Sequence, residues 1–297
     1  MIGFGVYGAA LAAVFAMPLG ALPRFALKSE LYSYIILVPF ISGYLLRLKR
    51  AEFPGGTPGP TPIIAVLVPA LAGVAALAAY ALISVRRWRI AEADYLSLTV
   101  FAFVCFLLAG SVWCFGWDRM RRLAFPVGFL VFLAPFPVIA TDWLEEFLRH
   151  ASAAVAAGFF ALTGETVLRD GTMFHLPGIN LEVAKECSGI HSSLVLFITS
   201  LLAGHLFLRS PWKKAVLALA VIPLGILRNG FRILTISMLC VHVDPSMIDS
   251  PIHHQGGPIF FVLSLVPFAG LLFLMRRWDG LGKAPKAAAP AGTASMK

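Results

Sequence analysis

Long apolar stretches separated by short polar segments run along most of the chain. An apolar run of about 20 residues is long enough to cross the hydrocarbon core of a bilayer as an α-helix. The pattern therefore predicts an all-α fold, a polytopic membrane helical bundle of about eight transmembrane helices. The runs of spanning length are residues 2–22, 31–48, 61–85, 93–117, 123–141, 187–208, 214–241 and 257–275.

Three other segments break this pattern. Residues 142–165 begin with several charged side chains and are predicted to form a helix that lies along the membrane interface. Residues 166–186 alternate apolar and polar positions around two glycines and a proline, which is typical of an extended loop or a short hairpin. Residues 280–297 are mostly Ala, Pro, Gly and Lys, and we expect this tail to be disordered.

The composition indicates a surface that faces lipid. Of the 297 residues, 59% are hydrophobic and only 13% are charged, whereas soluble domains are about a quarter charged. The net charge of +9 comes from basic residues that form short clusters between the apolar runs. The sequence shows no basic face with interleaved aromatic residues, so we expect the lipid bilayer as a partner and no nucleic acid.

The basic clusters predict the orientation of the bundle, because Lys and Arg gather on the cytoplasmic side of membranes. If four of the clusters are cytoplasmic, both termini are cytoplasmic, and the sixth and the last apolar runs begin on the outer side. A fifth cluster, within residues 86–89, then lies outside, against the rule. The four cytoplasmic clusters are within residues 47–50, 119–122, 209–214 and 276–286.

Cysteine is the first candidate for chemistry. Cys187 lies between Glu186 and Ser188, where the sixth apolar run starts. A helix N-terminus lowers the pKa of a thiol, which makes Cys187 a candidate nucleophile. Alternatively, Glu186 and Ser188 only satisfy the free amides of a helix start. The remaining cysteines lie inside apolar runs, where cysteine behaves as a small hydrophobe; they are Cys105, Cys114 and Cys240.

Arg232, which lies inside an apolar run, is the second candidate. Arg232 is predicted to stand about ten residues from the outer end of its span. A charge at that depth costs on the order of 3 kcal/mol unless it is paired or lines a cavity. Arg232 is therefore a candidate functional group, or else a partner of Glu186 or Asp249 in a structural ion pair.

Histidines supply the candidate bases, because imidazole titrates near neutral pH. His253 and His254 directly precede the last span. His191 follows Cys187 by four residues, which would place it on the same helical face as an alternative base. These side chains could in principle gather zinc, but only Cys187 and His191 have a helical ligand spacing, so we expect no metal and no cofactor.

A thiol, a guanidinium and an imidazole are thus predicted to lie in or near the outer leaflet, on three consecutive spans. Together they provide the nucleophile, the oxyanion stabiliser and the proton carrier of an acyl transfer. The alternative is a membrane transporter or channel that uses Arg232 and the histidines as an ion or proton relay. Many transporters are built from internal repeats, and the sequence shows none.

Three short motifs follow one another in the second half of the chain. They are residues 186–190 (Glu-Cys-Ser-Gly-Ile), residues 229–233 (Asn-Gly-Phe-Arg-Ile), and His253 with a glycine four residues later and a phenylalanine eight residues later. Their order and spacing resemble the cysteine, asparagine–arginine and histidine motifs of the exosortase/archaeosortase family. The chain departs from that family at Lys185 and His191, where many members carry Glu and Arg.

The resemblance covers roughly residues 125–275 and implies a sortase-like cysteine protease or transpeptidase. The family acts on exported proteins that carry a C-terminal PEP-CTERM sorting signal: a motif such as Pro-Glu-Pro, a transmembrane helix and a basic patch. The third motif carries a histidine, His253, and in this respect the chain resembles the bacterial exosortase branch. That resemblance implies the bacterial inner membrane, with the active site facing the periplasm. The implied domains are N-terminal transmembrane helices over 1–122, an exosortase-like catalytic membrane core over 123–279 and the tail 280–297.

The resemblance also implies a role for each motif residue. Cys187 attacks the peptide carbonyl, Arg232 stabilises the oxyanion or holds the thiolate, and His253 protonates the leaving amine and activates the incoming nucleophile. Asn229 orients Arg232 or a substrate carbonyl. Four further residues are expected to support the site: Glu186, Ser188, His191 and His254.

Overall fold

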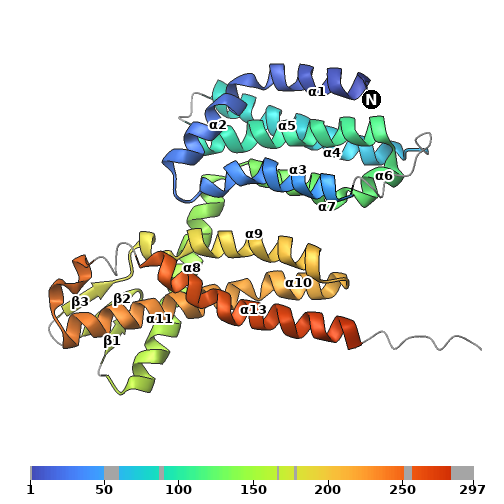
Figure 1. The fold of residues 1–297 in the computed structure, drawn as a ribbon. Helices are drawn as coiled ribbons and strands as arrows, with labels where there is room; N and C mark the ends of the chain where they lie inside the picture. The colour runs from blue at the N-terminus through green and yellow to red at the C-terminus, as the bar shows by residue number, and fades with distance from the viewer. Residues whose placement is uncertain are drawn as a thin grey trace, which may run out of the picture. The chain divides into compact units, whose positions relative to one another are not determined.

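The structure is a computed structural model that describes residues 2–49, 60–86, 90–165, 167–176, 179–250 and 256–281. It divides into two compact units, Met1–Phe147 and Leu148–Lys297, and the border between them falls within helix α8 (Figure 1). Helices dominate both units, so the predicted all-α polytopic membrane bundle is confirmed.

The first unit is built around α5, which is buried over much of its length. Leu96, Val100 and Ala102 of this helix are fully buried, and α1, α2 and α4 pack against it. Asp94 in its first turn accepts a 2.8 Å hydrogen bond from the backbone N–H of Val138, where α8 starts. The elements are α1 (Ile2–Val14), α2 (Ala16–Lys28), η1 (Ser33–Leu37), α3 (Val38–Lys49), α4 (Ile63–Val85), α5 (Glu92–Phe115), α6 (Trp117–Arg122), α7 (Ala124–Gly128), η3 (Phe129–Leu133) and α8 (Val138–Thr163).

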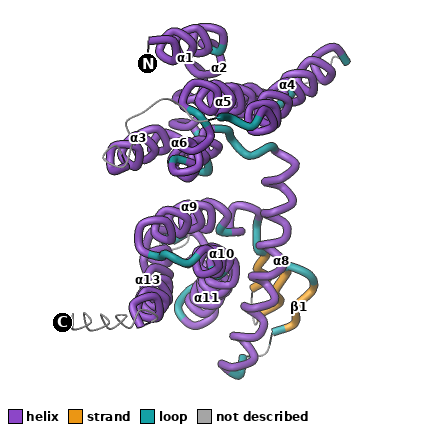
Figure 2. Tube along the Cα trace, turned by 90° about the vertical axis from the view of Figure 1, so that its right-hand side faces the viewer, coloured by secondary structure: helices purple, strands orange, loops and turns teal. Residues whose placement is uncertain are grey.

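The second unit combines the end of α8 with a small sheet and three long helical segments. The three strands form an antiparallel meander in the order β1-β2-β3, with Phe174 opposite Leu181. Figure 2 shows the strands beside α8. The elements are β1 (Leu168–Asp170), β2 (Met173–Leu176), β3 (Ile179–Glu182), η4 (Lys185–Ser188), α9 (Ile190–Phe207), α10 (Pro211–Leu219), α11 (Val221–His242), η5 (Pro245–Asp249) and α13 (Gly257–Leu281).

Among the described residues of the second unit, α11 contributes to two apolar clusters. The first half of α11 joins α9, α10 and α13 in one cluster, which contains Leu196, Leu217 and Phe268. The second half of α11 joins α8 and the sheet in the other cluster, with Phe160 and Phe174 at its centre. The sequence 229–233 of the asparagine–arginine motif lies where α11 passes from one cluster to the other.

The helices differ in detail from the eight predicted spans. Among the described residues, five helical segments are long and apolar enough to cross a membrane, or up to seven if two bent pairs each form one span. The first bent pair divides the predicted span 2–22 at Phe15, with an angle of 70° between its helices. The predicted span 31–48 is divided between the short helix η1 and the 12-residue α3.

The structure also differs from the predicted span 123–141 and the predicted interface helix 142–165. Pro135 and Pro137 lack the N–H donors that a continuous helix requires, so η3 ends before them and α8 starts after them with a bend of 92°. Residues 138–141 therefore belong to the same 26-residue helix as most of the predicted interface segment. The extended segment 166–186 contains a third strand in addition to the predicted hairpin. The tail beyond Leu281 lies outside the described residues.

Candidate active site

The cysteine motif forms a tight turn between the sheet and α9. The 3₁₀ helix η4 contains Cys187 and is followed by Gly189 in the left-handed conformation (φ 73°), after which α9 begins at Ile190. Ser188 is 2% exposed, and its hydroxyl accepts a 3.4 Å hydrogen bond from the Ile190 N–H. Ser188 thus satisfies a free amide at the start of α9, which is the alternative role that the sequence suggested for this residue. The side chains of Glu186 and Cys187 lie outside the described part of the structure.

The carbonyl of Gly189 links this turn to α9 and α11 by hydrogen bonds. It accepts hydrogen bonds from the Ser193 N–H at 3.0 Å, from the Ser192 hydroxyl at 3.1 Å and from Nη2 of Arg228 at 3.1 Å. Two of these bonds come from α9, whereas the third comes from α11. The backbone two residues after Cys187 is therefore tied directly to the helix that carries the asparagine–arginine motif.

Glycines let α11 approach its neighbours closely. A Cβ atom at Gly225 would lie 2.6 Å from the Ser193 hydroxyl of α9, and one at Gly230 would lie 2.7 Å from a methyl group of Val155 on α8. Asn229 lies between these two glycines in the sequence and is only 1% exposed. Its amide group borders the same turn, since a Cβ at Gly189 would be 3.3 Å from Oδ1 of Asn229.

Arg232 lies one helical turn after Arg228 on the same face of α11, because side chains four residues apart in a helix are neighbours. It is half-buried, and α11 continues for ten more residues to His242. Arg232 is thus well inside its helix, as the sequence predicts. The side chains of Glu186 and Asp249, its predicted ion-pair partners, are outside the described part of the structure.

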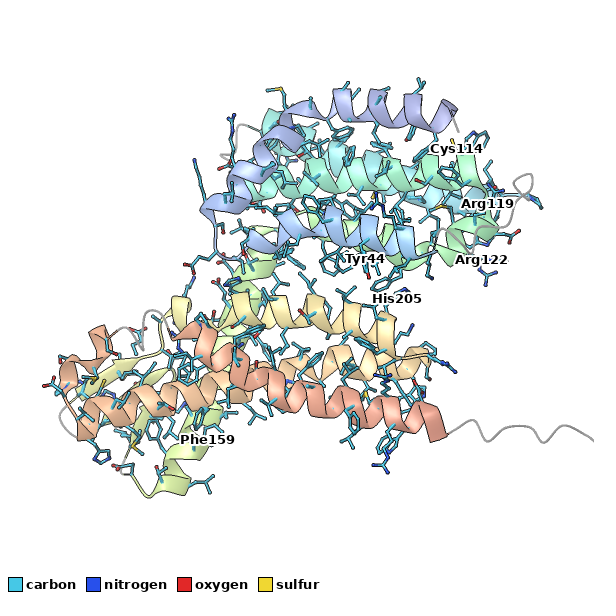
Figure 3. All side chains as sticks on the ribbon, in the orientation of Figure 1. Tyr44, Cys114, Arg119, Arg122, Phe159 and His205 are labelled. Carbon is cyan, nitrogen blue, oxygen red and sulfur yellow. The ribbon has the colours of Figure 1, made fainter. Side chains whose placement is uncertain are left out.

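Residues 251–255, which include His253 and His254, are likewise outside the described residues. Their flanking elements η5 and α13 both pack against α11. Phe231, in the middle of the asparagine–arginine motif, makes edge contacts with Phe159 of α8 (labelled in Figure 3) and Phe260 of α13, at centroid distances of 6.5 and 6.4 Å. The last helix therefore begins beside this motif.

His191 is described, and its position weakens one argument from the sequence. It lies in the first turn of α9, whereas Cys187 belongs to η4. The left-handed Gly189 separates the two segments, so the i, i+4 relation of a continuous helix does not apply to this pair. As for metals, no group of three or more His, Cys, Asp or Glu side chains within the described residues could hold a metal ion.

Arg228 is the residue that the sequence interpretation missed. It is 8% exposed and is the α11 side chain that binds the turn after Cys187. A signal was present, because Arg228 is a second arginine inside the same apolar run as Arg232, and buried charges in membrane helices are usually functional.

Residues 26–270 match the family described as transmembrane exosortase. The chain belongs to the transmembrane exosortase family. The match includes most of the first unit as well as the second, so it is longer than the resemblance over residues 125–275. Comparisons with curated proteins and with solved structures found no match. This exosortase is therefore a multi-pass membrane protein in a lipid bilayer.

Proposed function

We propose that this exosortase is a cysteine transpeptidase or protease that cleaves exported proteins at a C-terminal sorting signal of the PEP-CTERM type. The proposal is supported by the family match over residues 26–270 together with one contact, the hydrogen bond from Arg228 on α11 to the Gly189 carbonyl. This contact joins the turn that contains Cys187 to the helix segment that contains Asn229 and Arg232.

In the proposed reaction, the Cys187 thiolate adds to the carbonyl carbon of the scissile peptide. The carbonyl oxygen becomes an oxyanion, which Arg232 stabilises, and Asn229 orients Arg232. As the carbonyl re-forms, the carbon–nitrogen bond breaks and the amine leaves with a proton from His253, so that a thioester remains on the cysteine. Water or an acceptor amine then loses a proton to His253, attacks the thioester and releases the thiolate.

The substrate is proposed to bind through its own transmembrane helix. Helices associate in lipid by close packing and by hydrogen bonds between them, so the helix of a sorting signal would pack beside the bundle. The short motif before that helix would then reach the turn that contains Cys187. This arrangement explains why a protease of this kind is itself embedded in the membrane.

The polarity of the second unit supports a periplasmic active site in the bacterial inner membrane. The cysteine turn precedes α9, and the basic cluster follows it, at the other end of a helix about 27 Å long. At that other end, Asp279 accepts hydrogen bonds from Nζ of Lys213 at 2.6 Å and from the Arg209 N–H at 3.0 Å. The end of α13 therefore lies beside the same cluster. Since basic clusters stay in the cytoplasm, the cysteine turn would face the periplasm.

The test is processing of a co-expressed membrane reporter that ends in a Pro-Glu-Pro motif, an apolar helix and a basic patch. We expect Cys187→Ala to be expressed and inserted but to stop cleavage, because it removes the nucleophile. The matched controls, which should cleave at the wild-type rate, are the replacements Cys105→Ala, Cys114→Ala and Cys240→Ala. Cleavage by Cys187→Ala near the wild-type rate would exclude the proposed reaction and favour a transporter.

A further inference from the structure

Arg228 has only part of its hydrogen-bonding capacity satisfied. Its Nη2 donates to the Gly189 carbonyl at 3.1 Å and approaches the Ser193 hydroxyl at 3.5 Å. Its Nη1 is buried and has no hydrogen-bond partner within the part of the chain that the structure describes. The side chain as a whole is 8% exposed. Within the described residues, a buried guanidinium thus faces the cysteine turn with Nη2 engaged and Nη1 without an acceptor.

Such an available donor requires an explanation. A buried polar group without a hydrogen bond destabilises the fold, and a charged group does so more strongly than a neutral one. Native proteins therefore leave few such groups, and those that remain are often functional. The Gly189 carbonyl already accepts three hydrogen bonds, so it is not a further acceptor for Nη1. An acceptor that arrives with a substrate would complete the site.

We propose that Arg228 is a catalytic residue whose Nη1 donates a hydrogen bond to the carbonyl oxygen of the scissile peptide. This inference rests on the proposed function. Nη2 would hold the turn behind Cys187, while Nη1 of the same planar group would bind the substrate oxygen beside Arg232. A guanidinium suits this double task because its donors are held in a rigid fork.

The contribution of Nη1 grows during the reaction. As the thiolate sulfur bonds to the carbonyl carbon, the π electrons of the C=O bond move to oxygen, and the hydrogen bond from Nη1 becomes charge-assisted at both ends. When the carbonyl re-forms, the electrons of the carbon–nitrogen bond go to the amine, which takes its proton from His253. Arg228 keeps all its protons throughout, so it acts as a fixed donor of an oxyanion hole.

The competing interpretation is that Arg228 only fixes the turn. Arg228→Lys separates the two, because lysine keeps the charge but its single nitrogen cannot occupy both Nη positions. Ser192→Ala measures the effect of loosening the turn alone, since it removes a different hydrogen bond to the same carbonyl. Arg209→Lys, at the exposed end of α9, controls for the exchange of arginine for lysine.

The experiment uses the full-length protein in proteoliposomes with the Pro-Glu-Pro reporter as the probe. Two quantities are measured: kcat and KM for cleavage, and the rate of alkylation of Cys187 by iodoacetamide when the other three cysteines are replaced by alanine. For Arg228→Lys we expect kcat to fall about 10²–10³-fold, as for loss of one oxyanion donor. We expect KM and the alkylation rate to stay within about 3-fold, because the bond to the uncharged carbonyl of the bound substrate contributes much less than the bond to the oxyanion.

Ser192→Ala should lower kcat less than about tenfold, which is the range of one neutral hydrogen bond, and Arg209→Lys should match the wild type. The inference is overturned if Arg228→Lys keeps its kcat, or if kcat and alkylation fall in parallel. If the lysine variant does not accumulate in the membrane, Arg228→Gln is judged by the same criteria. Cleavage by Cys187→Ala would refute the proposed function itself, whereas an inactive Cys187→Ala beside a fully active Arg228→Lys refutes only this inference.

Discussion

Replacing Gly189 by alanine tests the contact that joins the cysteine turn to α11. Gly189 has a φ of 73°, a conformation that costs a residue with a Cβ roughly 1–2 kcal/mol. The new Cβ would also lie 2.7 Å from Nη2 of Arg228, so the arginine must move. Losing its hydrogen bond to the Gly189 carbonyl costs about a further 1.5–3 kcal/mol. The whole destabilisation is therefore about 2.5–5 kcal/mol.

Gly171→Ala is the matched control for this change. Gly171 lies in the turn between β1 and β2 with a φ of 59°, and a Cβ there would meet nothing within 4 Å. It should therefore lose only the conformational part, about 1–2 kcal/mol. The free energy of unfolding is measured by circular dichroism during SDS titration of the protein in mixed micelles, and reporter cleavage is measured in parallel. Cleavage should fall sharply for Gly189→Ala and stay near wild type for Gly171→Ala.

A double-mutant cycle refines the test. In an Arg228→Ala background the alanine Cβ at position 189 has no guanidinium to displace, so Gly189→Ala should cost only about 1–2 kcal/mol there. If Gly189→Ala and Gly171→Ala were equally destabilising, or if the cost at Gly189 were the same with and without Arg228, the assigned contact between this turn and α11 would be wrong.

Two further predictions concern the base and the topology. At matched expression, His253→Ala should slow cleavage by about 10²–10⁴-fold, as expected for loss of a general acid–base group. His254→Ala and His191→Ala should cause only mild defects. A severe loss of cleavage in His191→Ala, with normal cleavage by His253→Ala, would move the base to α9. A reporter that is active only in the cytoplasm should give a signal when fused after Lys214 and none when fused after Pro251; signals at both positions would contradict the orientation, because the histidine segment would then be cytoplasmic.

The fold class could be predicted from the sequence because the hydropathy of a spanning helix is a local property. Each apolar run had to satisfy its own backbone hydrogen bonds in lipid, which favours helices without reference to their neighbours. The breaks in these helices were harder to predict from the sequence. Pro135 and Pro137 stand inside the predicted span 123–141, and their effect on its continuity was overlooked. The third strand was also missed, because β1 is only three residues long and is exposed at all three positions, so it has no alternating pattern.

In the candidate site, too, some features could be predicted from the sequence and others could not. The motifs with Cys187, Arg232 and His253 are short and continuous, so the sequence alone indicated the family that the comparison then showed. The roles of these three residues stay predictions. The i, i+4 argument for His191 failed because Gly189 interrupts the helix, although a glycine beside a serine is a recognisable turn signal.

Sequence by itself thus determined the membrane bundle, the order of the motifs and the family. Only the tertiary structure decided that α11 passes through two apolar clusters and that Arg228 holds the carbonyl of Gly189, 39 residues away in the chain. The physical reason is that hydropathy and motif identity are written in neighbouring residues. A hydrogen bond between a helix and a distant turn depends instead on how closely the elements that carry them approach, which here is set by Gly225 and Gly230 packing against α9 and α8.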